Sequence, residues 1–396
     1  MRSRMALRVA LFFGLLALVT SVASVYVVRR GREVLPMSPV RARMIAWALF
    51  LCCVLPLIRF FAPVEGWIAS LATFGYGVGL ACVLATALLV LVDLVSTLAR
   101  RVGKREPSPT PDDAPTMPRR EMIRRVAIGA SLTSAAATSA YGIALGRFDY
   151  VLEEVPVRLR RLPRALDGYT IAQLSDVHLG NFVGRAQIAA ARSLVARTRA
   201  DLVVLTGDLV DHDPRYLGDL GLLVRAMADA GARDGVVAVL GNHDDYTGSD
   251  EVTATLRAAG VRVLRNDAIT IGDAGGRFAL LGVDDVLARR NGYGEGADLP
   301  RAIRAAPEDL ARVLLCHNPM LFTEAAPDVD LQLSGHTHGG QINMVVHPAE
   351  LIMPYVAGRY VRGESQLYVN RGFGTAGPPA RVGTPPEVTR IVLVAG

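Results

Sequence analysis

Carboxylates and histidines recur in five short motifs in the second half of this sequence, and each motif directly follows an apolar run. The candidate donors are Asp176 and His178 in SDVH, Asp208 in GD, Asn242 and His243 in GNHD, His317, and His336 and His338 in GHTHGG. Oxygen and imidazole donors without a thiolate suit borderline divalent ions such as Mn, Fe, Zn or Co. The donors outnumber the ligands that one ion needs, so the pattern predicts a site for two divalent metal ions.

These motifs require a sheet that brings its strand ends together. From Tyr169 onward, short apolar runs alternate with amphipathic stretches, which is typical of α/β proteins. The predicted strands are 170–174, 202–206, 236–240, 278–283, 313–316, 331–334, 366–370 and 388–394, and the predicted helices are 185–200, 217–230, 251–259 and 300–305. Groups just past the strand ends of an open sheet converge on one edge, where ligands bind.

The order D-x-H, G-D, G-N-H-D, H and G-H-x-H resembles the calcineurin-like metallophosphoesterase superfamily. The segments SDVHLG, GHTHGGQI and the closing NRGFG with PPE resemble its membrane-associated bacterial branch. The resemblance runs from about Pro156 to the C-terminus and does not cover the N-terminal part. It implies an α/β fold in which two packed β-sheets lie between helices, an α-β-β-α sandwich.

The resemblance also implies how the two ions would be held. One would be bound by Asp176, His178, Asp208 and His338, and the other by Asp208, Asn242, His317 and His336. Asp208 would therefore bridge them, which is chemically sensible because a carboxylate offers two oxygens and offsets the repulsion between two cations.

The histidine beside Asn242 has a different expected role. His243 would be the general acid that protonates the leaving oxygen, and Asp244 would hold its tautomer, as carboxylates commonly do for a working imidazole. A solvent-facing turn carboxylate is the alternative for Asp244. His212 and His347 lie in loops outside the motifs, and we expect both to face solvent.

The composition is too apolar for a purely soluble chain, with 51% hydrophobic residues and a mean hydropathy of +0.31. Three N-terminal runs each have roughly the 20 residues that a helix needs to cross the bilayer hydrocarbon. They are Ala6–Val28, Met44–Val64 and Trp67–Val92. A fourth run, Val126–Leu145, is uncharged but rich in Ala, Ser and Thr, and is interpreted as a weak span, a cleaved signal or a buried helix. The sequence thus predicts a bundle of three to four transmembrane helices.

Charge is divided unevenly along the chain. Residues 1–125 hold 17 Lys and Arg against 7 acids, whereas residues 126–396 hold 26 against 30. No nucleic-acid partner is expected, because binding to a phosphate backbone needs clustered cations. In a four-span topology, thirteen cations lie in the loops on one side and at most four on the other. Since such cations stay cytoplasmic, we predict a multi-pass protein of the inner (plasma) membrane with an extracytoplasmic catalytic domain.

The predicted domains are a transmembrane region over 1–99, a basic, Pro-rich cytoplasmic linker over 100–125, a fourth span or internal signal over 126–146, and a metallophosphoesterase domain over 147–396. The signal interpretation depends on the segment RREMIR at 119–124. This segment resembles a twin-arginine export signal, which would carry the C-terminal domain outward.

The leading hypothesis is a membrane-anchored two-metal phosphoesterase. Its anchor would confine it to the membrane, so that a lipid-linked or cell-envelope phosphate ester is the expected substrate. One alternative is an enzyme similar to UDP-2,3-diacylglucosamine pyrophosphohydrolase, whose substrate is made on the cytoplasmic side and conflicts with the predicted orientation. The other is a catalytically silent metal-binding membrane sensor or scaffold, against which the intact His243 argues.

Overall fold

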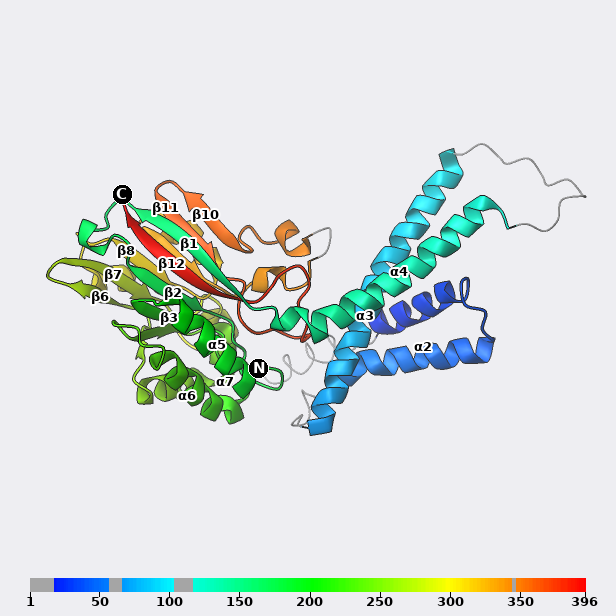
Figure 1. Ribbon diagram of the computed structural model, residues 1–396, viewed down its shortest axis with the longest axis horizontal. Helices are drawn as coiled ribbons and strands as arrows, with labels where there is room; N and C mark the ends of the chain where they lie inside the picture. The colour runs from blue at the N-terminus through cyan, green and yellow to red at the C-terminus, as the bar shows by residue number, and fades with distance from the viewer. Residues whose placement is uncertain (1–17, 57–65, 103–116, 344–346) are drawn as a thin grey trace, which may run out of the picture. The chain divides into compact units, whose positions relative to one another are not determined.

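The computed structural model describes residues 18–56, 66–102, 117–343 and 347–396. The chain forms two compact units, Met1–Ala144 and Leu145–Gly396. We call them the N-terminal unit, drawn from blue to cyan-green in Figure 1, and the C-terminal unit, drawn from green to red. All the predicted site residues belong to the C-terminal unit.

The N-terminal unit is helical where it is described. A helix over residues 18–31 is followed by α2 (Pro39–Val54), α3 (Gly66–Val102) and α4 (Arg119–Ala144). Small side chains let α3 and α4 approach each other, and Ser139 of α4 donates a hydrogen bond to the carbonyl oxygen of Gly77 in α3 at 2.7 Å.

Two helical segments of the described chain are long and apolar enough to cross a membrane, Ser70–Arg101 and Arg119–Phe148. They contain most of the third and fourth predicted runs. Residues 6–17 of the first run and 57–64 of the second lie outside the described residues. The predicted bundle of three to four spans is therefore not confirmed, and two candidate spans stand in its place.

The first sheet of the C-terminal unit has the strand order β1-β12-β2-β3-β4-β5. Its strands are β1 (Val151–Leu159), β2 (Thr170–Leu174), β3 (Leu202–Thr206), β4 (Val236–Val239), β5 (Arg262–Val263) and β12 (Glu387–Ala395). Strands β2 to β5 are parallel, while β12 runs antiparallel to β2 and parallel to β1. Every residue of β2, β3 and β4 is buried, as expected for parallel strands covered on both faces.

The second sheet has the order β10-β11-β9-β8-β7-β6. Its strands are β6 (Asp267–Asp273), β7 (Gly276–Gly282), β8 (Arg312–Leu315), β9 (Leu331–Ser334), β10 (Gly358–Arg362) and β11 (Ser365–Val369). The four central strands are parallel, and β6 and β10 pair with their neighbours in antiparallel fashion at the two edges.

The two sheets pack face to face, with helices on their outer sides (Figure 1). Their shared core includes Ile171 and Val204 from the first sheet and Phe278 and Val313 from the second, all fully buried. The first sheet is covered by α5 (Arg185–Thr198), α6 (Leu217–Ala228) and α7 (Asn242–Ala258), and the second by α9 (Leu299–Ala305) and α10 (Phe322–Ala325). The short helix α8 (Ala288–Asn291) follows β7 in the chain. A mixed α/β fold with two packed sheets is thus confirmed.

Two kinds of feature differ from the predictions made from the sequence. Strands β1, β5, β6 and β10 were not predicted. All four are sheet edges, and β1, β6 and β10 consist mainly of exposed and partly buried residues instead of forming an apolar run. The helix predicted over 251–259 begins earlier, at Asn242. The GNHD motif therefore forms the N-cap and the first turn of α7.

Candidate metal centre

The strand ends of the two sheets meet, and they bring the predicted ligands together. Asp176 and His178 follow β2, Asp208 follows β3, Asn242 opens α7 after β4, His317 follows β8, and His336 and His338 follow β9. Gln173 joins the sheets here, because its side-chain amide donates a hydrogen bond to the carbonyl oxygen of Ser334 at 2.9 Å. The fold thus places all seven side chains at one edge.

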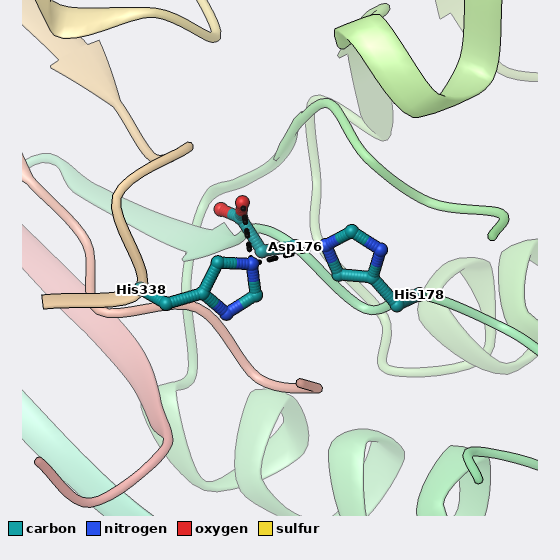
Figure 2. A group of neighbouring side chains, drawn as sticks. All are labelled: Asp176, His178 and His338. Carbon is teal, nitrogen blue, oxygen red and sulfur yellow. Dashed lines mark hydrogen bonds and ion pairs between the residues drawn. The ribbon is translucent and has the colours of Figure 1, made fainter. Parts of the chain in front are cut away.

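Asp176, His178 and His338 form the first group of donors (Figure 2). The Nε2 atoms of His178 and His338 lie 3.0 Å apart, and His338 Nε2 lies 3.4 Å from Asp176 Oδ1. All three side chains are buried, and one donor atom from each lies within 4.8 Å of the others. Two imidazoles and a carboxylate at such spacing can hold one divalent ion.

Asp208, His317 and His336 form the second group. His317 Nε2 lies 3.2 Å from both Asp208 Oδ2 and His336 Nδ1. Beside this group, Asn242 Oδ1 is buried and has no hydrogen-bond partner among the described residues. Because a buried acceptor without a partner is costly, this oxygen fits a metal ligand.

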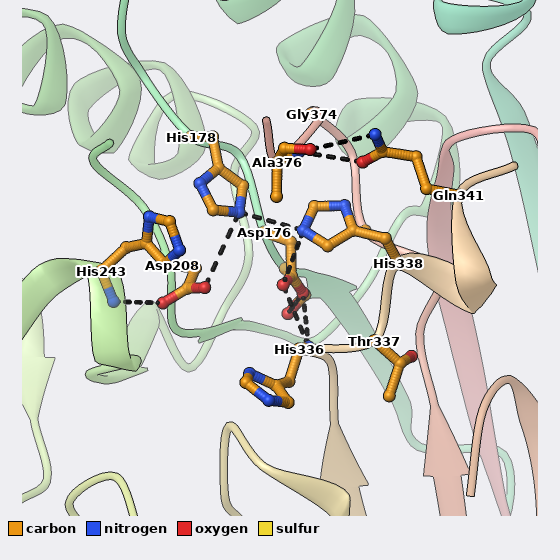
Figure 3. A network of polar contacts seen from close by, with 12 residues as sticks. Asp176, His178, Asp208, His243, His336, Thr337, His338, Gln341, Gly374 and Ala376 are labelled. Carbon is orange, nitrogen blue, oxygen red and sulfur yellow. Dashed lines mark hydrogen bonds and ion pairs between the residues drawn. The ribbon is translucent and has the colours of Figure 1, made fainter. Parts of the chain in front are cut away.

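Asp208 of the second group also contacts the first group, and Figure 3 shows it beside His178. Its Oδ2 atom is 3.2 Å from His317 Nε2 and 3.7 Å from His178 Nε2. Asp176 makes a second link, since both its oxygens accept the backbone N–H of His336 at 3.0 Å. The place of Asp208 is the one that a bridging carboxylate would need.

Two contacts orient the imidazole rings from behind. His317 Nδ1 lies 2.8 Å from the carbonyl oxygen of Thr206 and donates to it, which leaves Nε2 for a ligand. Arg381, which the sequence analysis did not single out, is buried under His338, with Nη2 3.2 Å from His338 Nδ1. Its guanidinium also donates to the carbonyl oxygens of Arg371, Gly372 and Gly374. Arg381 therefore fixes the backbone that follows β11 against the site.

Burial and charge shift the pKa values of these groups in different directions. Burial alone would lower the pKa of His317, but the negative charge of Asp208 raises it well above its ordinary value. Burial, together with the charge of His178, lowers the pKa of His338 well below its ordinary value. Burial and the charge of His317 lower the pKa of His336 to about 4. Neutral rings such as these two are the form that a metal ion requires.

Five of the seven predicted ligands have a left-handed backbone. Their φ angles are 51° at Asp176, 51° at His178, 53° at Asp208, 74° at His336 and 51° at His338. Residues with a Cβ seldom adopt this conformation, which costs about 1–3 kcal/mol each and is concentrated at functional sites. Two glycines add to this tight geometry, because a Cβ at Gly335 would clash with the Asp176 carboxylate and one at Gly241 with that of Asp208.

His243 lies beside the second group, and its neighbouring carboxylate is Asp211. The backbone N–H of His243 donates to Asp208 Oδ1 at 2.8 Å, and its Nδ1 lies 3.1 Å from Asp211 Oδ1. The prediction that Asp244 holds the tautomer of His243 is wrong. Asp244 is fully buried, not solvent-facing, and its oxygens accept the backbone N–H groups of Leu209, Val210 and Gly241. It caps α7 and fastens the loop after β3 to it.

The remaining two histidines differ from each other. His212 has a 42% exposed side chain, as expected, but its ring centroid lies only 4.1 Å from that of His243, so it stands next to the site. His347 is exposed and its Nδ1 lies 2.8 Å from Glu350. Asp211 was missed altogether, although its place three residues after Asp208 in GDLVD puts it in the same turn.

Known proteins resemble this chain over the same segment. The family model described as calcineurin-like phosphoesterase matches residues 169–340, which contain all seven predicted ligands and His243. A metallophosphoesterase of Aquifex aeolicus is 32% identical over 253 residues, 62% of this chain and 92% of that protein. A metallophosphoesterase of Bacillus subtilis is 29% identical over 287 residues, 70% of this chain and 98% of its own length.

A further relative is a transmembrane protein with metallophosphoesterase domain of Bos taurus. It is 35% identical over 254 residues, which are 61% of this chain and 56% of that protein. The chain therefore spans little more than half the length of this relative.

Proposed function

We propose that this chain is a metal-dependent hydrolase of phosphate esters, because it belongs to the calcineurin-like metallophosphoesterase family. Two divalent ions would be held by Asp176, His178, Asp208, Asn242, His317, His336 and His338. The convergence of these side chains from five strand ends of two sheets carries the proposal. Six of the seven are buried and His336 is partly buried, which suits permanent ligands better than surface groups that bind ions by chance.

The donor atoms fit two ions of the Mn, Fe, Zn or Co class. Each group offers imidazole nitrogens and a carboxylate without a thiolate. The unpartnered oxygen of Asn242 completes the second set, and Asp208 is shared. When bound, such ions activate a water nucleophile and offset the negative charge that develops on the phosphoryl oxygens.

His243 would donate the proton that the leaving oxygen needs. Asp211 accepts a hydrogen bond from Nδ1, which stabilises the protonated ring and leaves Nε2 for the substrate. The bond from the His243 backbone to Asp208 fixes the start of α7 against the ligand set. A proton at Nε2 can then pass to the alkoxide as the bond to phosphorus breaks.

The substrate that we propose is a lipid-linked or cell-envelope phosphate ester. A short helix, η7 (Pro348–Leu351), packs against Gly340 of the GHTHGG motif. A Cβ added at Gly340 would lie 3.1 Å from the Cβ of Ala349. Leu351 and Ile352 at its end are each 83% exposed. Adjacent apolar side chains beside the site suit contact with a lipid, since their exposure to water is otherwise unfavourable.

The proposed location is the inner membrane, with the chain crossing it more than once and the C-terminal unit outside. The two candidate spans and the excess of cations in the predicted cytoplasmic loops support this orientation. A phosphatase reporter that works only after export should be active when fused after Arg147 and inactive when fused within 106–118. The reverse result would favour the pyrophosphohydrolase alternative.

The activity itself can be tested on metal-stripped protein. Mn, Fe and Zn are added back separately, and hydrolysis is measured on p-nitrophenyl mono- and diesters, on lipid phosphates and on a nucleotide-linked glycolipid pyrophosphate. We expect metal-dependent release of phosphate or alcohol from at least one ester. If no metal restores hydrolysis of any of these substrates, the proposal fails and the sensor or scaffold alternative is favoured.

A further inference from the structure

A second cluster of metal-binding side chains lies outside the seven-residue set. It consists of Asp211, His212 and His243, which we call the rim cluster. Asp211 Oδ1 is 3.1 Å from His243 Nδ1 and 3.5 Å from His212 Nε2. One donor atom from each residue lies within 4.8 Å of the others, as in the two groups of the metal centre.

The backbone and an aromatic neighbour hold His212 in this place. Its ring stacks on Tyr246, with centroids 5.2 Å apart and the planes inclined by 1°. Its φ angle of 58° is left-handed, like those of five predicted ligands. Such a conformation persists where the surrounding structure fixes it, so the ring is held next to Asp211 and not left free to turn away.

We infer that the rim cluster binds a third, exchangeable divalent ion of the zinc class and that this ion inhibits hydrolysis. Two imidazoles and one carboxylate form a ligand set that zinc accepts, with a further position left for water. The side chain of His212 is 42% exposed, so an ion can enter from solvent. Magnesium prefers oxygen ligands and should not bind there.

We expect inhibition because the ion would bind Nδ1 of His243. This step rests on the proposed role of His243 as general acid. An ion that binds Asp211 and Nδ1 of His243 replaces the 3.1 Å contact between these two groups. The His243 ring is then held as a metal ligand and loses the support of Asp211, so it cannot act as the proton donor for the leaving oxygen.

The ligand role of His212 can be tested without disturbing the metal centre. His212→Asn removes the imidazole, and asparagine tolerates a left-handed backbone. His347→Asn is the matched control, because His347 is also exposed and contacts a carboxylate, Glu350, but belongs to no group of three donors among the described residues. The intact chain is stripped of metal and loaded with two equivalents of zinc, and more zinc is then titrated in.

Binding and turnover are measured in parallel. In equilibrium dialysis the wild type and His347→Asn should take up a third equivalent of zinc, and His212→Asn should bind it at least about tenfold more weakly. Hydrolysis of an alkyl phosphate ester should fall as the third ion binds. The inhibitory zinc concentration should rise by the same factor of at least about ten in His212→Asn.

Equal zinc binding by the wild type and His212→Asn would overturn the site. A third ion that depends on His212 but does not slow the alkyl ester would overturn the inhibition. If the protein hydrolyses no ester with any metal, the proposed function fails, yet dialysis still decides whether the third ion binds.

Discussion

The metal centre and the rim cluster contain the same kinds of side chain, but they differ in depth. His317 and Asp176 of the centre are fully buried, whereas His212 of the rim is 42% exposed and Asp211 is 14% exposed. Burial fixes the geometry of the first set and keeps water from competing for it. At the rim, protons and ions can exchange with solvent. Depth, more than residue type, therefore separates the proposed permanent ligands from the rim cluster, where we propose an exchangeable ion.

The largest effect should come from Asp208, which contacts both groups of donors. Asp208→Asn replaces an anionic bridge by a neutral amide, so we expect lower occupancy at both metal sites and a loss of turnover of about 10⁴-fold or more. Metal analysis and hydrolysis of an alkyl phosphate ester check this. The control is Asp213→Asn, an aspartate that pairs with Arg215 in the same loop. Two tightly held ions per chain in Asp208→Asn would contradict the bridging role.

The next largest effect should come from His243 at the boundary between the two regions. His243→Ala should retain both metal ions yet slow turnover by about 10² to 10⁴, the usual contribution of one positioned proton donor. The loss should be smaller for p-nitrophenyl esters, because p-nitrophenolate leaves without a proton. His347→Ala serves as the control. An equal loss on both kinds of ester, with metal intact, would refute the role of general acid.

Asp211 and Asp244 provide a sharper comparison, because both lie near His243 but differ in their contacts. Asp211→Asn should slow turnover about 10- to 100-fold with metals retained, since it weakens the support of the protonated ring. Asp244→Asn should instead lower the free energy of unfolding by about 1–3 kcal/mol, because three backbone N–H groups lose an anionic acceptor. Kinetics and denaturant unfolding measure the two effects. A kinetic loss confined to Asp244→Asn would reverse the assignment.

The smallest effect should come from the exposed pair on η7. Leu351→Ser combined with Ile352→Ser should slow hydrolysis of a lipid phosphate in vesicles by about 3- to 10-fold, because less apolar surface enters the lipid. Hydrolysis of a soluble p-nitrophenyl ester should not change. Val361→Ser is the control, since Val361 is 62% exposed on β10. Equal effects on both substrates would count against contact with lipid.

The interior of the fold could be predicted from the sequence because buried parallel strands are continuous apolar runs. Strands β2, β3 and β9 match their predicted bounds. The edge strands could not be predicted in this way, because strands such as β10 leave most of their residues exposed and show no apolar run. Strand β1 was missed for a similar reason, since only two of its nine residues are buried.

The candidate site could also be predicted only in part. The motif residues could be placed at one edge because each follows a strand, and five strand ends meet there. The roles of Asp211 and Asp244 could not be read, because spacing alone does not say which carboxylate faces a side chain and which one caps a helix. Arg381 gave no signal either, since its partners are backbone carbonyl groups and a ring from another strand end.

The position of β12 has a consequence for the order in which the chain is made. It lies between β1 and β2, although Glu387 comes 213 positions after Leu174. During synthesis, β1 and β2 therefore wait with unpaired edges until nearly all of the unit has left the ribosome. Pairing between such distant segments is slow. Any truncation that removes β12 should therefore leave β1 and β2 without the strand that joins them.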